Sequence, residues 1–378
     1  MTGLIPILRA AISSDHLDPA VLDKDTVLWA VRAGLGPLTF HLVGNRISEI
    51  TEKASQGALR SADLVARLTI SDTLDALEEL LAVSADIARE IILLKGISAC
   101  QFLYPEPHLR TMGDIDLLIP VHSRQRLETL LYDLGYRQQS NHPAAYYEAH
   151  HHSMPFFHPL RHIWVEVHTA LFSGAPAASY PVFSPSHIGS RAVPITFRGH
   201  ATNRLGSEQE LIYLATHWAL ERKCFVGGAI PFFDLALIIR QQGSALDWKD
   251  VCARLRDSRT ATYLYLMLRF LDKHGTVSIP PVVMQQLCGA QQHPLGNSEA
   301  ILHGMIERYS MCGRSFGRVT SEANLGIIWE TLLAPSPAWR NLFRVPGHVL
   351  FPPGQPRRFS PGFQLARLAG ALGLRRYF

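Results

Sequence analysis

Cysteine pairs and long apolar runs are both missing from this sequence. The five cysteines are odd in number, far apart and without a CxxC pair, so neither a disulfide framework nor a zinc site is indicated, and we expect reduced core residues. The longest apolar run, residues 225–239, is interrupted by Pro231 and Asp234 and is shorter than the roughly 20 residues that cross a bilayer. The start of the chain also lacks the residue order of a signal peptide. We therefore expect no transmembrane segment and a cytoplasmic location.

Acidic residues are absent after Glu330, whereas the same stretch contains seven arginines. Without those arginines the formal net charge of +4 becomes −3, so the basic character is local. The basic charge of this tail has three explanations: contact with nucleic-acid phosphates, contact with anionic lipid, or packing across the core with the arginines in solvent. We expect packing, because its prolines favour an ordered segment with little helix and no known RNA-binding motif is present. One short helix is predicted there, over residues 364–372.

Apolar residues are plentiful enough for a large core, since 47% of the 378 residues are hydrophobic and 18% are charged. This composition is typical of a globular protein of two or three domains. Apolar positions recur at helical spacing before residue 85 and beyond Gly206, while short apolar runs between them predict strands. We predict an α+β fold with a small mixed β-sheet core between N-terminal and C-terminal helical segments. The predicted boundaries are 1–85 for the first helical segment, 86–200 for the core, 201–335 for the helical C-terminal domain and 336–378 for the basic tail.

The predicted core starts with a short apolar run at residues 91–94, which ends at Lys95 and turns into a helix that Pro105 breaks. A second strand follows at 115–119, and the next helix covers 124–134. A strand pair is predicted beyond them, because two apolar segments flank a turn that contains proline. This pair spans 152–157 and 163–168, and the later helices span 208–220, 232–241, 248–255 and 262–273.

Asp114 and Asp116 flank Ile115 in the second predicted strand. Because side chains alternate along a strand, the two carboxylates project from the same face. Paired carboxylates repel each other unless a cation lies between them, and Mg²⁺ prefers such hard oxygen ligands together with substrate phosphates. Glu166, which shares a strand face with His168, is a candidate third carboxylate for a two-metal site. A D-x-D pair is also common at a solvated strand end, so its neighbours decide the interpretation.

Several neighbours of the aspartates are suited to an anion. Lys95 and Gly96 open the predicted helix, whose backbone N–H groups and dipole favour a phosphate. Ser98 lies in the first turn and can donate a hydrogen bond, and Arg110 can add a guanidinium. We predict that these residues hold a nucleoside triphosphate, although a lysine that only extends to solvent from a strand end is the alternative for Lys95.

Four motifs combine these residues in a fixed order. They are LKGIS at 94–98, LRTMGDIDLLIP at 109–120, LGY at 134–136 and VEVH at 165–168. Together they resemble the bacterial uncharacterised nucleotidyltransferase family of the DNA polymerase β superfamily. The similarity extends to residues 36–38, 210–217 and 233–248 and so covers most of the chain.

The resemblance implies that Asp114 and Asp116 bind Mg²⁺, that Glu166 completes the metal site and that Gly96 lets the triphosphate approach the backbone. The expected activity is transfer of a nucleotide from a nucleoside triphosphate, with ATP as the expected donor, and release of pyrophosphate. The usual glycine-serine pair after the first strand is here Lys95-Gly96, which also resembles toxin-type nucleotidyltransferases that modify transfer RNA. The acceptor therefore stays open among RNA, protein, peptide and small molecule. A non-catalytic nucleotide- or RNA-binding protein that retains the fold is the second hypothesis.

Histidines add further candidates. Three adjacent histidines, 150–152, are not expected to bind one metal ion, because neighbouring residues of a strand face opposite ways. His151 or His152 is predicted to contact a phosphate or the base. His168 is predicted to orient Glu166 or to assist proton transfer, with a purely structural role as the alternative. Asp234 and His217 are expected to be caps or buried hydrogen-bonding groups, with a role in shaping an acceptor pocket as the alternative.

Overall fold

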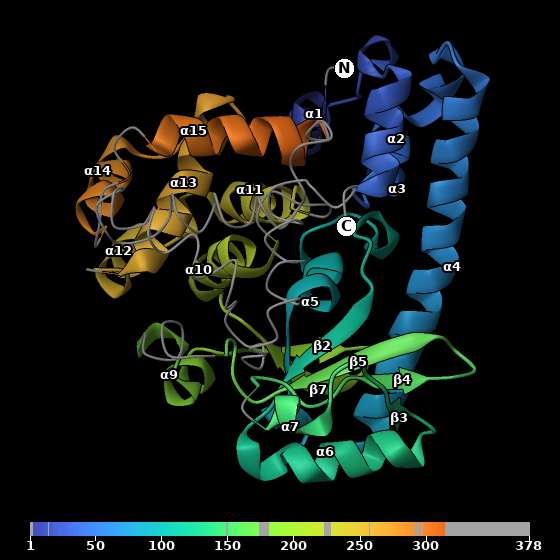
Figure 1. The fold of residues 1–378 in the computed structure, drawn as a ribbon, viewed down its shortest axis with the longest axis vertical. Helices are drawn as coiled ribbons and strands as arrows, with labels where there is room; N and C mark the ends of the chain where they lie inside the picture. The colour runs from blue at the N-terminus through green and yellow to red at the C-terminus, as the bar shows by residue number, and fades with distance from the viewer. Residues whose placement is uncertain are drawn as a thin grey trace, which may run out of the picture.

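Helices form the upper part of the protein and a β-sheet forms the lower part in the computed structural model (Figure 1). The structure describes residues 3–313 except 14, 149, 174–180, 223–227, 257, 292–294 and 296–297. The predicted α+β class is confirmed: helices at both ends of the described chain flank a mixed sheet. The predicted tail 336–378, with its helix at 364–372, lies outside the described residues.

The helical start of the chain is confirmed. Asp23 begins the second helix, because its carboxylate accepts a hydrogen bond of 2.7 Å from the backbone N–H of Thr26. The fourth helix has 31 residues, which makes it about 46 Å long, and it runs along one side of the protein from the helical part to the sheet (Figure 1). These helices are α1 (Ile5–Ser13), α2 (Lys24–Arg32), α3 (Gly36–Val43) and α4 (Lys53–Val83).

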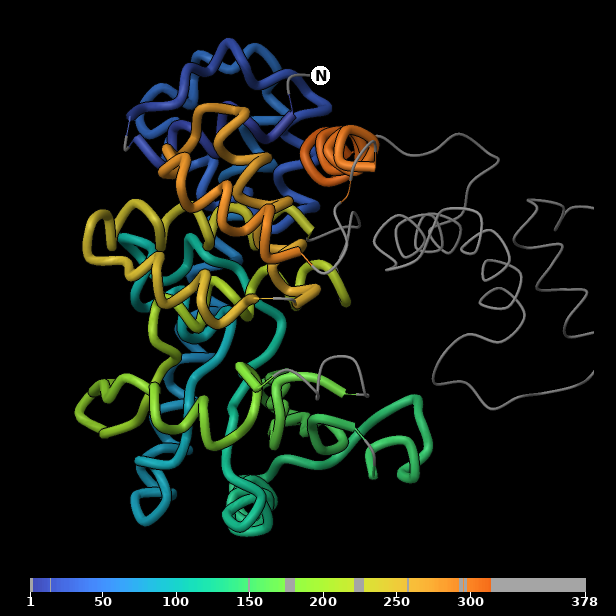
Figure 2. The backbone as a smooth tube through the Cα atoms, turned by 90° about the vertical axis from the view of Figure 1, so that its left-hand side faces the viewer, coloured from blue at the N-terminus to red at the C-terminus, as the bar shows by residue number. Residues whose placement is uncertain are grey.

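The C-terminal helices pack against the N-terminal ones in one hydrophobic core. The indole N–H of Trp29 donates a hydrogen bond of 2.9 Å to the carbonyl of Ser310, and the backbone N–H of Leu4 donates one of 2.8 Å to Met311. Both ends of the described chain therefore lie side by side (Figure 2). The four predicted helices are present, two more follow them, and π-helical segments occupy Trp218–Arg222 and Ile306–Met311. The helices are α10 (Ser207–His217), α11 (Ile230–Gln242), α12 (Trp248–Arg254), α13 (Arg259–Lys273), α14 (Pro281–Gly289) and α15 (Ser298–Met305).

The sheet has seven strands in the order β3-β4-β5-β2-β1-β7-β6. Its central pair, β5 and β2, is parallel, and the pairs on either side of it are antiparallel. Short helices connect the strands: α5 (Lys95–Phe102), α6 (Val121–Asp133), α7 (Ala144–Tyr147) and α9 (Pro185–Ser190). The strands are β1 (Ile92–Leu93), β2 (Asp114–Leu118), β3 (Arg137–Gln138), β4 (Phe156–His158), β5 (Ile163–His168), β6 (Val193–Phe197) and β7 (His200–Arg204).

One face of the sheet is apolar and the other carries the polar residues. Ile115 and Leu117 of β2 and Val165 of β5 are fully buried in a second core. The C-terminal half of α4 and helix α6 complete this core. Because strand side chains alternate, Asp114 and Asp116 face the opposite way, toward the helical part of the protein.

Some predicted details are wrong. The strand expected at 152–157 is shorter, because β4 begins at Phe156 and His152 makes only an isolated bridge to His168. The hairpin of β6 and β7 was not predicted, because most of its side chains are at least partly exposed and give no clear apolar alternation. Cys100 and Cys252 are buried as expected, but Cys288 is exposed and is therefore not a core residue.

Among the described residues, every helix is too short or too polar to cross a bilayer.

Candidate active site

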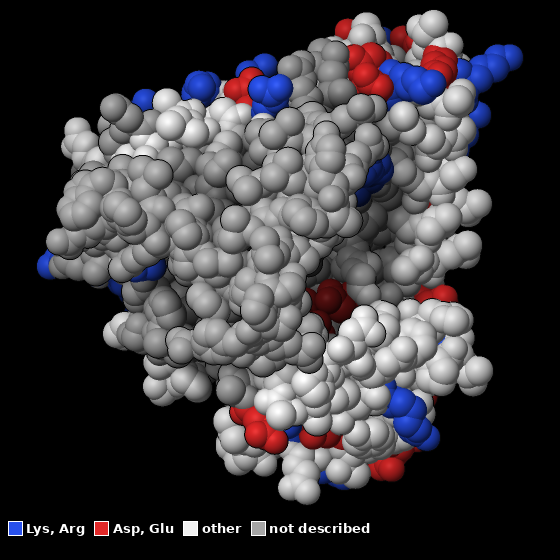
Figure 3. Space-filling model, in the orientation of Figure 1, with Lys and Arg blue, Asp and Glu red and all other residues white. Residues whose placement is uncertain are grey.

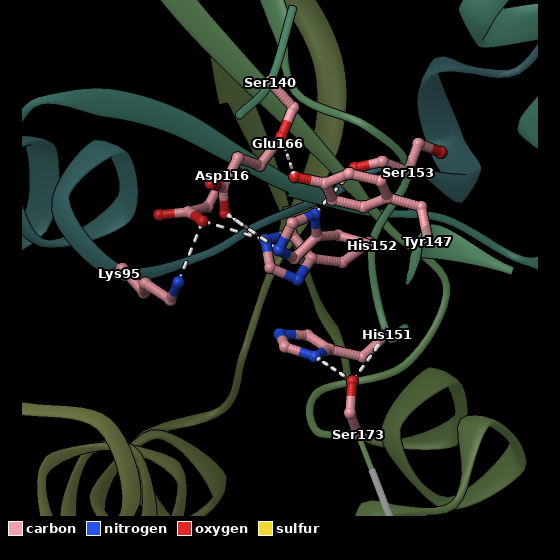
Figure 4. Close-up of polar contacts among 10 residues, drawn as sticks. Lys95, Asp116, Ser140, Tyr147, His151, His152, Ser153, Glu166 and Ser173 are labelled. Carbon is pink, nitrogen blue, oxygen red and sulfur yellow. Dashed lines mark hydrogen bonds and ion pairs between the residues drawn. The ribbon is translucent and has the colours of Figure 1, made fainter. Parts of the chain in front are cut away.

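Asp116 lies at the centre of a group of polar side chains on the face of the sheet that is turned toward the helices (Figure 4). Its carboxylate is only 2% exposed, and one oxygen, Oδ1, accepts two hydrogen bonds. Lys95 Nζ donates one of them at 2.9 Å, and His168 Nε2 donates the other at 2.8 Å. Since Lys95 starts α5 and His168 ends β5, three elements meet at this carboxylate.

Glu166 lies directly opposite Asp116, because the parallel register of β2 and β5 pairs these two residues. Its Oε2 atom lies 3.4 Å from His168 Nε2 and 3.9 Å from His152 Nε2. The same imidazole nitrogen of His168 thus lies between two carboxylates. The prediction that Glu166 is on a strand next to the aspartates is confirmed.

The residues around Asp116 stabilise the charged forms of one another. Burial raises the pKa of Asp116, but Lys95 and His168 outweigh burial and hold that pKa well below its usual range. Burial lowers the pKa of His168, but its hydrogen bonds to Asp116 and Glu166 outweigh burial and raise it overall. Burial also raises the pKa of Glu166, but the hydrogen bond from His168 and the charges of His152 and His168 together outweigh it, so the net change is downward. Both carboxylates are therefore ionised at neutral pH.

Lys95 has an unusual backbone conformation. Its φ of +49° lies in the left-handed region, which costs a residue with a side chain on the order of 1–3 kcal/mol and is found most often at functional sites. The next residue, Gly96, allows close packing, since a Cβ atom there would lie 2.7 Å from the Cβ of Met112. The chain thus enters α5 through a strained turn that places the ammonium group of Lys95 on Asp116.

A recess of about 280 Å³ lies in front of this group, between the sheet and the helices. Figure 3 shows acidic atoms at the bottom of a hollow near the centre of this face. A larger apolar cavity of about 560 Å³ shares part of the wall but contains no carboxylate, so we assign the chemistry to the smaller recess. The recess is lined by Arg32, Ala33, Gly34, Lys95, Gly96, Arg110, Thr111, Met112, Gly113, Asp114, Asp116, Leu214, His217, Ile230 and Pro231.

Arg110 lines the recess, and a buried carboxylate holds it there. Its Nε and Nη2 atoms donate to Asp234 of α11 at 2.9 and 2.8 Å, and Tyr104 donates to the same carboxylate at 2.8 Å. The side chain of Asp234 is completely buried, which confirms the expectation that it is a buried hydrogen-bonding group. The positive charge of Arg110 thus stays in the wall of the recess, while the two guanidinium nitrogens that could donate to a phosphate together already donate to Asp234.

The remaining predicted residues divide between the recess and its surroundings. His217 is buried, as expected, and also lines the recess. Ser98 is buried in α5 and is not part of the recess wall. His152 lies on the Glu166 side of the group, outside the recess wall.

The expectation for the three adjacent histidines rests on a wrong premise. Residues 150–152 do not form a regular strand, so their side chains do not alternate. One ring nitrogen of each histidine lies within 4.8 Å of a ring nitrogen of the other two. The three imidazoles therefore gather on one side of the chain, and a shared ligand is geometrically possible.

The carboxylate group has a donor set that fits Mg²⁺. Side-chain atoms of Asp116, Glu166 and His168 lie within 4.8 Å of one another, so the two carboxylates are close enough to bind one cation. Asp114 is on the same face of β2 and lines the recess beside Asp116. Carboxylate oxygens at the edge of a recess that can admit phosphates are the arrangement in which Mg²⁺ is usually held.

Residues 22–274, more than half of the chain, match the sequence model of a family described as an uncharacterised nucleotidyltransferase. The chain belongs to this family. The protein is thus a nucleotidyltransferase, a transferase enzyme with a nucleotide substrate. No curated protein and no solved structure matches the chain.

Sequence motifs did not reveal every residue of the nucleotidyltransferase recess. Arg32 is the last residue of α2 and Gly34 lies just after it, whereas Ile230 and Pro231 are the first two residues of α11. These residues are distant from the aspartates in sequence and belong to ordinary helix ends. No local pattern distinguishes them, since only the packing of the helices over the sheet brings them to the site.

Proposed function

We propose that this nucleotidyltransferase carries out Mg²⁺-dependent transfer of a nucleoside monophosphate from a nucleoside triphosphate, with ATP as the donor, to an acceptor oxygen. The observation that supports the proposal best is the register that sets Glu166 against Asp116 while Asp114 shares their face. Lys95 and the start of α5 lie at the same recess and supply positive charge and backbone N–H groups for phosphates. A place in the DNA polymerase β superfamily is part of the proposal.

Asp114, Asp116 and Glu166 are the residues that would hold the metal. When bound, Mg²⁺ supplies charge stabilisation for the attacking and leaving oxygens of a phosphoryl displacement. In that displacement the acceptor oxygen forms a bond to the α-phosphorus as the bond from that phosphorus to the β-phosphate oxygen breaks, and pyrophosphate leaves. The acceptor proton passes to a nearby base or to water.

His168 and Lys95 have distinct roles in this scheme. His168 is completely buried and contacts Asp116 and Glu166, so it is a positioning residue that orients both carboxylates. Lys95 is 13% exposed at the recess and can exchange its contact with Asp116 for one with a triphosphate oxygen. Arg110 contributes its charge from the wall while Asp234 keeps it in place. Positioning and electrostatic stabilisation then supply most of the rate acceleration.

Isosteric substitutions test the assignment. Asp114→Asn, Asp116→Asn and Glu166→Gln remove one negative charge each without changing the volume of the side chain. We expect each variant to lose transfer of label from α-³²P-labelled nucleoside triphosphates in the presence of Mg²⁺ and cell extract. The matched control is Asp133→Asn, since Asp133 is exposed at the end of α6 and is expected to leave activity unchanged.

Unchanged activity in Asp116→Asn would contradict the proposal. Binding of the labelled nucleotide by the wild-type protein without any labelled product would favour a binding protein that retains the fold. A product that is labelled by the wild type and absent with Asp116→Asn identifies the acceptor by its mass and its sensitivity to ribonuclease or protease. Labelled transfer RNA would support the toxin-type alternative for the acceptor.

A further inference from the structure

A second cluster of ligating side chains lies beside the carboxylate group. His150, His151 and His152 follow α7, and their ring centroids are 4.2–4.9 Å apart. Each contributes a nitrogen within 4.8 Å of the other two. Imidazole nitrogen suits zinc-like transition metals, whereas the carboxylates next to it suit Mg²⁺.

The backbone of this segment is fixed by several hydrogen bonds. The carbonyl of His151 accepts hydrogen bonds from the backbone N–H groups of Thr169 at 2.9 Å and Ala170 at 3.2 Å, just after β5. The N–H of His151 donates to Ser173 Oγ at 2.8 Å, and that of Ser153 donates to Val167 at 2.9 Å. The three imidazoles therefore start from an anchored backbone, which lowers the entropy lost when they bind one ion.

Hydrogen bonds also orient the rings. His152 Nδ1 lies 2.7 Å from the carbonyl of Ser153, and because a carbonyl only accepts, Nδ1 must carry the proton. The lone pair of His152 is then on Nε2, the nitrogen that can bind a metal. His151 Nδ1 lies 2.6 Å from Ser173 Oγ, a contact of the kind that orients metal-bound histidines from outside the coordination sphere (Figure 4).

We infer that His150, His151 and His152 form a binding site for one divalent transition-metal cation of the zinc class. Zinc–nitrogen bonds of about 2.0–2.1 Å place tetrahedral ligands roughly 3.3 Å apart, so side-chain rotations from separations of up to 4.8 Å complete the site. Three histidines leave one coordination position open for water, for an anion or for Glu166, whose Oε2 lies 3.9 Å from His152 Nε2. This inference does not depend on the proposed function.

Metal titration of the full chain, made without a histidine tag and treated with chelator, tests the site. Excess Mg²⁺ is present throughout to saturate the carboxylate group. We expect the wild type to bind one equivalent of Co²⁺ with the visible absorption of a nitrogen-ligated ion, and Zn²⁺ to displace it. His150→Ala and His151→Ala should each weaken Zn²⁺ binding by more than about 100-fold.

Two controls separate this site from others. His122→Ala removes an exposed histidine of α6 and should bind Zn²⁺ like the wild type. Asp116→Asn alters the carboxylate group and should also retain the binding. Loss of binding in Asp116→Asn with retention in the histidine variants would place the ion among the carboxylates and overturn the inference.

A second test uses only the wild-type protein and therefore does not depend on whether any variant folds. Zn²⁺ should protect the peptide that contains His150, His151 and His152 from modification by diethyl pyrocarbonate, detected by mass spectrometry, while His122 stays reactive. Equal modification of that peptide with and without Zn²⁺, or the absence of stoichiometric Co²⁺ binding, would refute the site.

Discussion

The buried pair of Arg110 and Asp234 gives the sharpest stability prediction. Asp234 is completely buried, the Arg110 side chain is 11% exposed, and two of its nitrogens contact the carboxylate at 2.8 and 2.9 Å. Burial lowers the pKa of Arg110, but the pair with Asp234 outweighs burial and keeps the guanidinium charged. Asp234→Asn therefore leaves a buried charge without its counterion. Breaking a buried pair in this way costs about 3–5 kcal/mol.

The free energy of unfolding, measured by urea titration with circular dichroism, checks this value. The matched control is Asp272→Asn, because Asp272 and Arg269 form a partly exposed pair at 3.6 Å and should contribute less than about 1 kcal/mol. The double variant Arg110→Met with Asp234→Asn removes both charges and should be less destabilised than the sum of the two single variants. A cost below about 1 kcal/mol for Asp234→Asn would refute the reasoning.

Three further predictions concern other parts of the site and its support. Burial raises the pKa of Glu210 from 4.5 to about 7, so the folded state loses stability as pH rises between these values. Glu210→Gln should therefore be more stable than the wild type at pH 8 by up to about 3 kcal/mol, with little difference at pH 4. Urea unfolding curves that are the same for the two proteins at both pH values would contradict this. Lys95→Met should lower kcat/KM for nucleotidyl transfer on the order of 100-fold, with partial recovery in Lys95→Arg, and an undiminished rate would exclude a phosphate-binding role. Gly96→Ala should lower the Tm through a cost of about 1–3 kcal/mol, because its Cβ meets the Cβ of Met112, whereas Gly57→Ala in open space on α4 should not; equal melting curves would show that the packing adjusts.

Prediction from the sequence succeeded where the local pattern and the tertiary structure impose the same requirement. The helices before and after the sheet follow from apolar residues at helical spacing, and they are present in the described part of the chain. The alternation of Asp114, Ile115 and Asp116 requires the carboxylates to share a face, and Ile115 is fully buried on the other side. The same rule links Glu166 with His168 on β5. These features depend only on side-chain period and apolar burial.

Prediction failed where the local pattern was weak or the chain left regular structure. The hairpin of β6 and β7 was missed because its exposed faces give no apolar alternation. Strand alternation was expected at the three histidines, whereas residues 150–152 form a bend held by backbone hydrogen bonds to the end of β5. Strand periodicity does not apply to such a bend.

The sequence by itself thus determined the helical segments before and after the sheet and the strand with two aspartates, because each depends on interactions between near neighbours. Only the tertiary structure decided that Glu166 pairs with Asp116, that Lys95 and His168 share one oxygen of Asp116, and that Asp234 occupies the guanidinium of Arg110. Those contacts join residues from 21 to 124 positions apart. Their geometry is set by sheet register and by helix packing, which near-neighbour patterns do not specify.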